Sequence, residues 1–334
     1  MKILVTGGGG FIGSALIREL VRKGYEVSSF SRKLYPDHLK LGIIVFQGDI
    51  ADPIAVESAC RGIDVVFHIA AKVGMWGYLD EFSRTNVCGT ENVINSCLKC
   101  KVRKMIFTSS ASVIFNGFDL KNADESIAYP QKPVSAYTAT KAIAEQLVLK
   151  ANSEVLNTIA LRPHLVWGPG DTQLISGILN RARTGKLRRI GKEDFLIDTT
   201  YIDNYIAAMI LTMGVMEKNP DVCGKPYFIT NDEPIMIWDF VNAILLASGI
   251  NPVTKVIPKT LAIIMAKILE KTYLVFNPKS EPYITSLIVS ELCSHHWFNI
   301  AEAKEKLGYS PHVSNEKGFE LLRSSIAAET LEST

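Results

Sequence analysis

A run of glycines near the N-terminus, Gly7 to Gly13, is the feature that most constrains the fold. Residues 3–5 before it are apolar and predict a buried strand, and residues 14–23 after it place apolar side chains on one helical face. In such strand-turn-helix units the glycines permit the turn, let a pyrophosphate approach the backbone and let the helix pack on the strand. The helix N-terminus then attracts the phosphates. The pattern predicts a dinucleotide site formed by Gly7, Gly10, Phe11, Ile12 and Gly13.

The pair Tyr137 and Lys141 indicates proton-transfer chemistry. Residues four apart on a helix project from the same face. An ammonium beside a phenol lowers the phenol pKa from about 10 toward neutrality, which makes the hydroxyl a usable acid or base. The same spacing occurs in helices that have no catalytic role, so this interpretation depends on the glycine turn upstream.

The end of the second predicted strand, residues 26–30, indicates which dinucleotide is bound. An acidic side chain there would bind the ribose hydroxyls and repel an added phosphate, but this strand runs into Ser31 and Arg32. Because a guanidinium matches the geometry of a phosphate, we expect both residues to bind a 2′-phosphate and to favour NADP(H) over NAD(H). The alternative is an ordinary solvated loop. Asp49 and Ile50, after the next apolar run, are expected to flank the adenine.

Apolar strands alternate with helical segments through the first half of the chain. The strands are expected at residues 65–70, 104–109 and 158–162, and the helices at residues 86–98 and 137–150. This order predicts an α/β fold with a doubly wound parallel sheet of Rossmann type. Ser109 and Ser110 then lie at the carboxyl end of a strand, where open parallel sheets bind their ligands.

The length of 334 residues is enough for a nucleotide-binding domain and a smaller lobe. We assign residues 1–170 mainly to the Rossmann domain. Residues 171–326 are assigned mainly to a C-terminal substrate lobe, some of whose strands and helices return to the first domain. Residues 327–334 are expected to be a disordered tail.

Composition and residue spacing exclude other classes of protein. The net charge of +2 gives no electrostatic case for nucleic acid. The six cysteines lie mostly in predicted helices or core, and no secretory signal precedes the first strand, so a cytoplasmic setting is expected. Cys97 with Cys100, and His295 with His296, have no companion ligands, so no metal site is expected.

The stretch from Thr260 to Phe276 is unusually apolar, but charged residues such as Lys267 interrupt it well before the ~20 residues that a membrane-spanning helix requires. An amphipathic lid over a hydrophobic pocket, or a surface in peripheral contact with a membrane, fits this pattern better. Core packing is the remaining interpretation.

Several segments give the chain a family resemblance. It resembles the extended short-chain dehydrogenase/reductases, and within them the 3β-hydroxysteroid dehydrogenase/isomerase branch, through residues 6–13, 86–90, 108–113, 137–141 and 161–163. Within that branch it is similar to the bacterial 2-alkyl-3-oxoalkanoate reductases of long-chain olefin biosynthesis, through residues 70–77, 161–171, 198–204 and 294–298. The resemblance implies an NADP(H)-dependent oxidoreductase that reduces a 2-alkyl-3-oxoalkanoate to the 3-hydroxy acid, and a homodimer formed through the helices that carry Asn86 and Tyr137.

The same resemblance implies a role for individual residues. Tyr137 would deliver a proton to the substrate oxygen, and Lys141 would tune Tyr137 and bind the nicotinamide ribose. Ser110 would orient the carbonyl oxygen, and Asn86 would hold the helix geometry and a water. Further cofactor contacts are expected from Ala70, Ala71, Lys72, Thr108, Ser109, Pro163, His164 and Val166, and substrate contacts from Met75, Trp76, Ser112 and Trp167 as well as Ser110 and Tyr137.

Alternatives stay open at this stage. His164 fits a cofactor contact and a core position equally well, and Met75 with Trp76 fits a hydrophobic substrate wall or a buried loop. For the whole chain, a sterol dehydrogenase, a sugar-nucleotide epimerase and a non-catalytic NADP(H) sensor compete with the reductase. Related dehydratases carry an Asp-Glu pair after the serine position, where this chain has Ala111 and Ser112. Regulators of this fold typically lose the tyrosine, which is present here.

Overall fold

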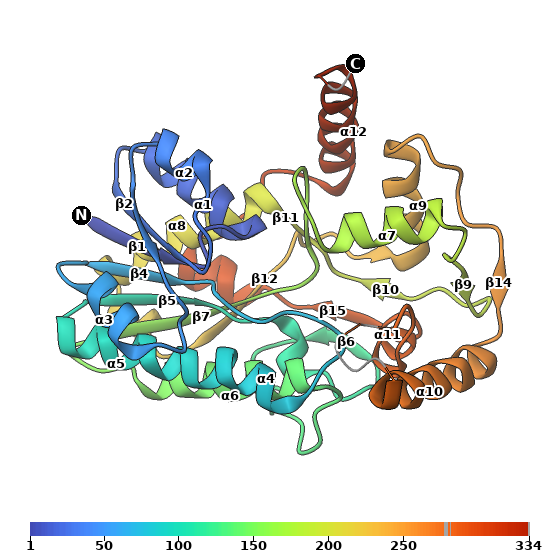
Figure 1. Cartoon of the computed structure of the whole chain (residues 1–334), viewed down its shortest axis with the longest axis horizontal. Coiled ribbons are helices and arrows are strands. Elements are labelled where there is room, and N and C mark those ends of the chain that lie inside the picture. Colours follow the sequence, from blue (N-terminus) through green and yellow to red (C-terminus); the bar gives the residue numbers. More distant parts are fainter. Residues whose placement is uncertain (277–279, 281, 333–334) are drawn as a thin grey trace.

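The computed structural model describes residues 1–276, 280 and 282–332. Its centre is a seven-stranded parallel sheet in the order β12-β7-β5-β4-β1-β2-β3 (Figure 1). These strands are β1 (Lys2–Thr6), β2 (Glu26–Ser31), β3 (Ile44–Gln47), β4 (Val65–His68), β5 (Lys104–Thr108), β7 (Asn157–Pro163) and β12 (Pro226–Ile229). The predicted doubly wound parallel sheet is confirmed.

Helices cover both faces of this sheet (Figure 1). One face carries α3 (Pro53–Cys60), α5 (Gly89–Cys100) and α6 (Ala136–Lys150), and the other carries α1 (Phe11–Arg22) and α8 (Ile202–Lys218). Along β1, Ile3 and Val5 pack in the core on one side while Leu4 packs in the core on the other. Because both faces are buried, the strand is apolar throughout instead of alternating with polar residues.

A second layer is built around a smaller four-stranded sheet, β13-β10-β15-β6. Its strands are β13 (Ile235–Met236), β10 (Leu196–Ile197), β15 (His296–Phe298) and β6 (Leu120–Ala123). Two short pairs complete the strands, β8 (Val166–Trp167) with β11 (Thr200–Tyr201) and β9 (Arg189–Ile190) with β14 (Val256–Ile257). Residues 171–326 supply most of this layer. They also supply strand β12 of the main sheet and helix α8, which packs on that sheet.

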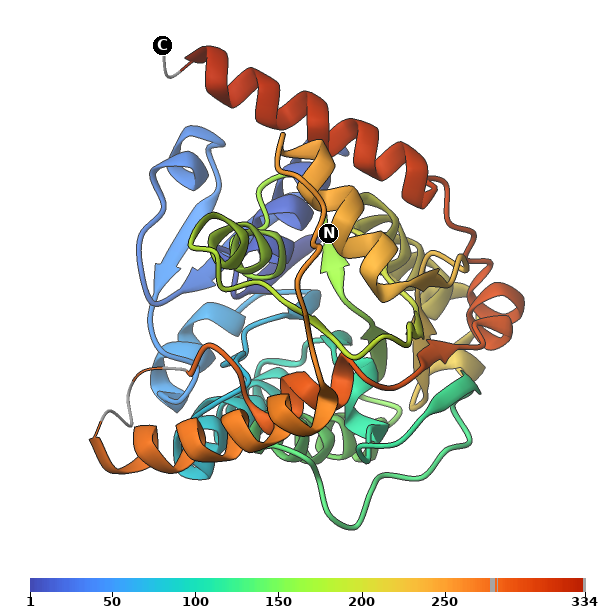
Figure 2. The same cartoon turned by 90° about the vertical axis from the view of Figure 1, so that its right-hand side faces the viewer.

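The remaining helices are short turns around the central layers and longer segments at the outside (Figure 2). The short ones are α2 (Pro36–Lys40), α4 (Leu79–Ser83), the π-helical turns η1 (Arg84–Cys88) and η4 (Ala303–Leu307), and the 3₁₀ turns η2 (Ala111–Ile114) and η3 (Pro220–Val222). The others are α7 (Leu174–Arg183), α9 (Ile237–Ala247), α10 (Lys259–Phe276), α11 (Ser286–Glu291) and α12 (Asn315–Glu332).

Helix α12 corrects the expectation of a disordered tail. The helix continues to Glu332, so the prediction is wrong for residues 327–332, and residues 333–334 lie outside the described part of the chain. The helix is anchored at its first turns, where the Asn315 side chain bonds Thr199 and Asn231 and Phe319 packs on Trp167. Local composition at the end of the chain does not reveal this anchor.

Helix α10 packs on the rest of the molecule through a face of small residues. Ala262 and Ala266 are fully buried, whereas Leu261, Ile264 and Ile268 are about half exposed. No helix among the described residues is long and apolar enough to cross a membrane. Whether the outer face of α10 forms a lid or a membrane contact stays a prediction.

Candidate active site

The glycine turn after β1 leaves no room for side chains. Gly7 has φ +71°, and a Cβ there would lie 2.7 Å from the backbone nitrogen of Ala70. A Cβ at Gly13 would lie 2.3 Å from the Gly7 carbonyl oxygen. Helix α1 starts after Gly10 without a side-chain cap, so its first N–H groups are available to an anion. Phe11 and Ile12 form the first residues of that helix, and the whole arrangement fits a dinucleotide pyrophosphate.

The end of β2 carries an exposed cation. Arg32 is exposed and forms no ion pair among the described residues, while the Ser31 hydroxyl donates to the Lys33 carbonyl. Asp49 accepts a hydrogen bond from Arg84 at 3.0 Å, and Ile50 is buried against the start of α5. The four predicted residues thus lie together around the ends of β2 and β3, and their contacts with a cofactor stay predictions.

The loop after β4 is fastened to the glycine turn and to α6. The Thr6 hydroxyl accepts from the backbone N–H of Ala70 at 3.3 Å. Two residues on, the backbone N–H of Lys72 donates to the Asn86 side chain at 2.7 Å, and the Asn86 amide donates to the Lys72 carbonyl at 3.0 Å and to Thr140 at 3.1 Å. Asn86 lies in η1, whose π-helical geometry sets its position, so it bridges the loop of Ala70, Ala71 and Lys72 to the helix of Tyr137.

Tyr137, Lys141 and Ser110 come together at the carboxyl end of β5. Ser110 lies close enough to the Tyr137 phenol to oppose the rise of its pKa, and the Ser110 hydroxyl lies 2.8 Å from that of Ser112. The Lys141 ammonium donates to the Thr108 carbonyl at 2.6 Å and lies 4.0 Å from the centre of the Phe107 ring. A capping box formed by Ser135 and Thr138 starts α6 immediately before Tyr137 and fixes the first turn. Ser109 is buried and directly follows Thr108, the last residue of β5.

Burial sets the protonation state of both groups. It raises the pKa of Tyr137 to about 12, against the hydrogen bond from Ser110 and together with the charge of Glu291. It lowers the pKa of Lys141 to about 7, against the attraction of Glu145. In this structure the Lys141 ammonium binds the Thr108 carbonyl and desolvation dominates at the phenol, so the lowering of the Tyr137 pKa by Lys141 stays a prediction. Tyr137 is a neutral phenol at pH 7, the form that donates a proton.

The segment after β7 lies largely in the core. His164 Nε2 is 2.7 Å from His296 Nδ1, and burial, followed by the neighbouring His296, lowers the pKa of His164. Pro163 ends β7 and Val166 begins β8. Trp167 is fully buried, where its indole N–H bonds Thr199. The structure therefore places Trp167 in the core and not in the substrate site, contrary to expectation.

Met75 and Trp76 lie in the loop between β4 and α4, and both are partly buried. The Trp76 indole N–H has no hydrogen-bond partner among the described residues, and Met75 packs on the main core. Their contact with a substrate stays a prediction.

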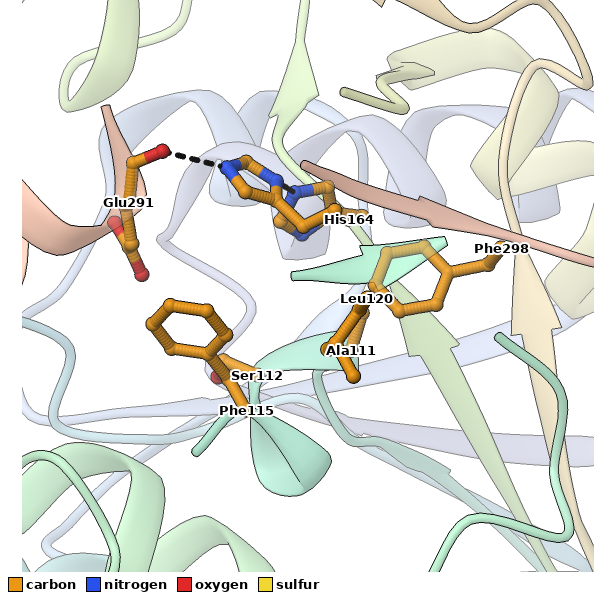
Figure 3. A pocket seen from close by; sticks show the side chains of 8 residues that line it. Ala111, Ser112, Phe115, Leu120, His164, Glu291 and Phe298 are labelled. Carbon is orange, nitrogen blue, oxygen red and sulfur yellow. Dashed lines mark hydrogen bonds between the residues drawn. The ribbon is translucent and has the colours of Figure 1, made fainter. Parts of the chain in front are cut away.

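A small pocket next to the Ser110–Ser112 pair contains residues that the sequence did not single out (Figure 3). Its walls are mostly apolar, with Glu291 as the only carboxyl group among the lining residues described: Ala111, Ser112, Phe115, Leu120, His164, Glu291, His296 and Phe298. The sequence indicates His296 only as a possible metal ligand, and no motif marks the single glutamate, Glu291, in its apolar helix. No group of three or more possible metal ligands occurs in the part of the chain that the structure describes.

Comparison with known proteins adds a family and a fold. A model of the 3-beta hydroxysteroid dehydrogenase/isomerase family matches residues 4–259. The chain is 42% identical over 331 residues to the 2-alkyl-3-oxoalkanoate reductase of Stenotrophomonas maltophilia, with 98% of this chain and 100% of the relative aligned. It is 34% identical over 324 residues to the decarboxylating sterol-4-alpha-carboxylate 3-dehydrogenase of Mus musculus, with 96% and 89% aligned.

Among solved structures, UDP-glucuronic acid 4-epimerase from Bacillus cereus in complex with NAD has a TM-score of 0.75 and 24% identity, over 98% of this chain and 99% of that one. This similarity shows a shared fold.

Proposed function

The chain belongs to the 3-beta hydroxysteroid dehydrogenase/isomerase family, and from this premise we propose that it is an NAD(P)(H)-dependent reductase of 2-alkyl-3-oxoalkanoates. The observation that carries the proposal is the cluster of Tyr137, Ser110 and the buried Lys141 at the sheet edge that also carries the glycine turn, with Tyr137 one helical turn from Lys141. This arrangement provides a proton donor and an oxygen-orienting hydroxyl side by side, which the reduction of a ketone to a secondary alcohol requires.

The names of the relatives support the substrate class. A 2-alkyl-3-oxoalkanoate carries its carboxylate on the carbon next to the ketone, and a sterol-4-alpha-carboxylate carries its carboxylate on the carbon next to the reacting C3. Both substrates therefore combine a β-oxygenated carboxylate with a large apolar body. The open-chain acid is preferred here because of the higher identity, and the sterol acid is the second candidate.

The residues of the chain have distinct tasks in this proposal. The glycine turn and the N-terminus of α1 hold the pyrophosphate, and Lys141 binds the nicotinamide ribose. When bound, the nicotinamide exchanges a hydride with the substrate carbon. Tyr137 donates its proton to the substrate oxygen, Ser110 orients that oxygen, and Asn86 holds the loop at Lys72 against α6.

We also propose that NADP(H) is preferred over NAD(H). No acid occurs at the end of β2, and Arg32 is exposed and unpaired among the described residues, which supports a role for its guanidinium in binding a 2′-phosphate. The Arg32→Ser variant should lose NADPH affinity and keep NADH affinity, measured by quenching of protein fluorescence, whereas Lys33→Ser serves as the matched control for a lost loop charge. Equal losses for both cofactors would refute this role.

The substrate assignment is tested by following the oxidation of NADPH and of NADH by purified protein given a long-chain 2-alkyl-3-oxo acid or a 3-ketosteroid. Consumption of NADPH with the oxo acid is expected. Turnover of the steroid alone would favour the sterol candidate, and tight cofactor binding without turnover of either would favour an epimerase or a sensor.

The two parts of the chain have different roles in this proposal. Residues 1–170 would mainly bind the cofactor, and residues 171–326 would mainly bind the substrate. The chain would form a homodimer through α5 and α6. The exposed Leu98 and Ile143 on these helices support this interface, and light scattering in solution tests it.

The outer face of α10 would make peripheral contact with a membrane, which flotation with lipid vesicles tests.

A further inference from the structure

Glu291 ends α11 and lines the pocket beside the proposed reaction centre (Figure 3). Its backbone carbonyl accepts a hydrogen bond from His296 Nε2 at 2.9 Å. The preceding residue, Ser290, bonds the Gly117 carbonyl, and Thr285 caps the start of the helix. These contacts hold the backbone of Glu291 in place and leave its carboxyl group directed to the cavity, over the ring of Phe115.

The pocket adjoins the atoms at which the carbonyl oxygen would bind. Ser112 lines the pocket, and its hydroxyl lies 2.8 Å from that of Ser110, which is near enough to Tyr137 to influence the phenol pKa. The charge of Glu291 also acts on Tyr137, where it adds to the effect of burial in raising the phenol pKa. Glu291 therefore lies near Tyr137, although the two residues come from different layers of the fold.

No cation neutralises Glu291 from the pocket walls. The lining residues described include no lysine or arginine, and the two imidazoles, His164 and His296, have pKa values lowered by burial and bond each other. On α10, the helix packed against α11, Lys259 bonds the Cys293 carbonyl and Glu270 bonds Ser286, so both charges are held at the ends of α11. Burial accordingly raises the pKa of Glu291 to about 7.

We propose that the Glu291 side chain is the binding group for the substrate carboxylate, to which it donates a hydrogen bond while Tyr137 and Ser110 hold the reacting oxygen. This inference rests on the proposed function, because it concerns a carboxylate on the carbon adjacent to the reacting one. Only one carbon separates the two groups in such a substrate, so a donor in the pocket next to Ser110 is within reach of the carboxylate. A hydrogen bond in which the acceptor is charged is stronger than a neutral one.

The proposal predicts a defined pH dependence. A substrate carboxylate is ionised above pH ~5, so it binds Glu291 only when that side chain carries its proton. As the pH rises above about 7, Glu291 ionises, the two carboxylates repel, and the KM of the acid should increase about tenfold per pH unit. An uncharged ester of the same substrate should show no such increase.

The experiment uses the stable 2-alkyl-3-hydroxy acid and its methyl ester in the oxidation direction, with KM and kcat measured from pH 6 to 9. We compare the natural protein with Glu291→Gln, Glu291→Ala and the control Glu125→Gln, which removes a buried carboxyl of raised pKa that lies outside this pocket. The amide of Glu291→Gln is a donor at every pH, so its KM for the acid should stay flat. Glu291→Ala should raise the KM of the acid about 10- to 100-fold at pH 6.5 and leave the ester within about threefold.

Each outcome bears on the proposal separately from the proposed function. A KM for the acid that rises with pH in Glu291→Gln as in the natural protein would overturn the inference. So would equal effects on acid and ester with a shifted kcat profile, which would show that Glu291 acts on Tyr137 instead. If the natural protein turns over neither compound, the proposed function itself fails.

Discussion

The ion pair between Glu145 and Arg162 is the interaction whose loss should cost most in stability. Both side chains are almost fully buried, and Arg162 donates from Nη2 at 2.6 Å and from Nε at 3.0 and 3.1 Å. The Tyr129 hydroxyl adds a bond to Glu145 at 2.6 Å. In Glu145→Gln, the guanidinium stays in the core without a counter-charge, which costs about 3–5 kcal/mol. Urea unfolding followed by circular dichroism measures this loss.

Two control variants test whether the loss of stability in Glu145→Gln comes from leaving a buried charge without a partner. Glu217→Gln removes the partner of Lys104 at an exposed position and should cost at most about 1 kcal/mol. The double variant Glu145→Leu with Arg162→Met removes both charges and should be much more stable than Glu145→Gln, because well-packed apolar residues replace a buried pair at little cost. A loss for Glu145→Gln no larger than that for Glu217→Gln would refute the reasoning, since it would mean that water reaches the pair.

The site and the glycine turn yield further expectations. Tyr137→Phe should lower kcat by about 10²–10⁴ with unchanged cofactor affinity by fluorescence quenching, and surviving turnover would show that another group supplies the proton. Burial lowers the Lys141 pKa from 10.5 to about 7, so the unfolded chain holds a proton that the folded chain releases, and stability should rise between those pH values; Lys141→Met should weaken this rise in urea titrations, and an unaltered slope would contradict it. Gly7→Ala should abolish cofactor binding and destabilise the fold by more than about 1–3 kcal/mol, because its Cβ meets the Ala70 backbone at 2.7 Å. Gly24→Ala, with φ +81° and open space around its Cβ, is the matched control for backbone strain alone, and similar losses in both would exclude the clash as the cause.

Some site features follow from local sequence because their geometry is local. The glycine spacing predicts the turn after β1 since each glycine is required by contacts within the same strand-turn-helix unit. The spacing of Tyr137 and Lys141 predicts one helix face, and both do lie on α6. Apolar runs predict the parallel sheet, because strands buried on both faces must be apolar throughout.

Protonation and long-range contacts do not follow in this way. The pKa values of Tyr137 and Lys141 move in the directions that burial dictates, and burial depends on how the layers pack around α6. A tryptophan suits the wall of a hydrophobic substrate pocket as well as a core, so its residue type alone does not place Trp167. In the structure it packs against Tyr201, Phe240 and Phe319 in the core.

The sequence by itself determined the parallel sheet, the glycine turn and the placing of Tyr137 and Lys141 on one helix, because strand alternation, helical periodicity and glycine turns are governed by contacts between neighbours in the chain. The family was indicated by the resemblance of its motifs. Only the tertiary structure decided that Glu291 shares a pocket with Ser112, that Arg162 is neutralised by Glu145, and that α12 is anchored through Asn315. These pairs join residues from distant parts of the chain or from separate elements, and their free energy depends on desolvation, which no periodic pattern in the sequence records.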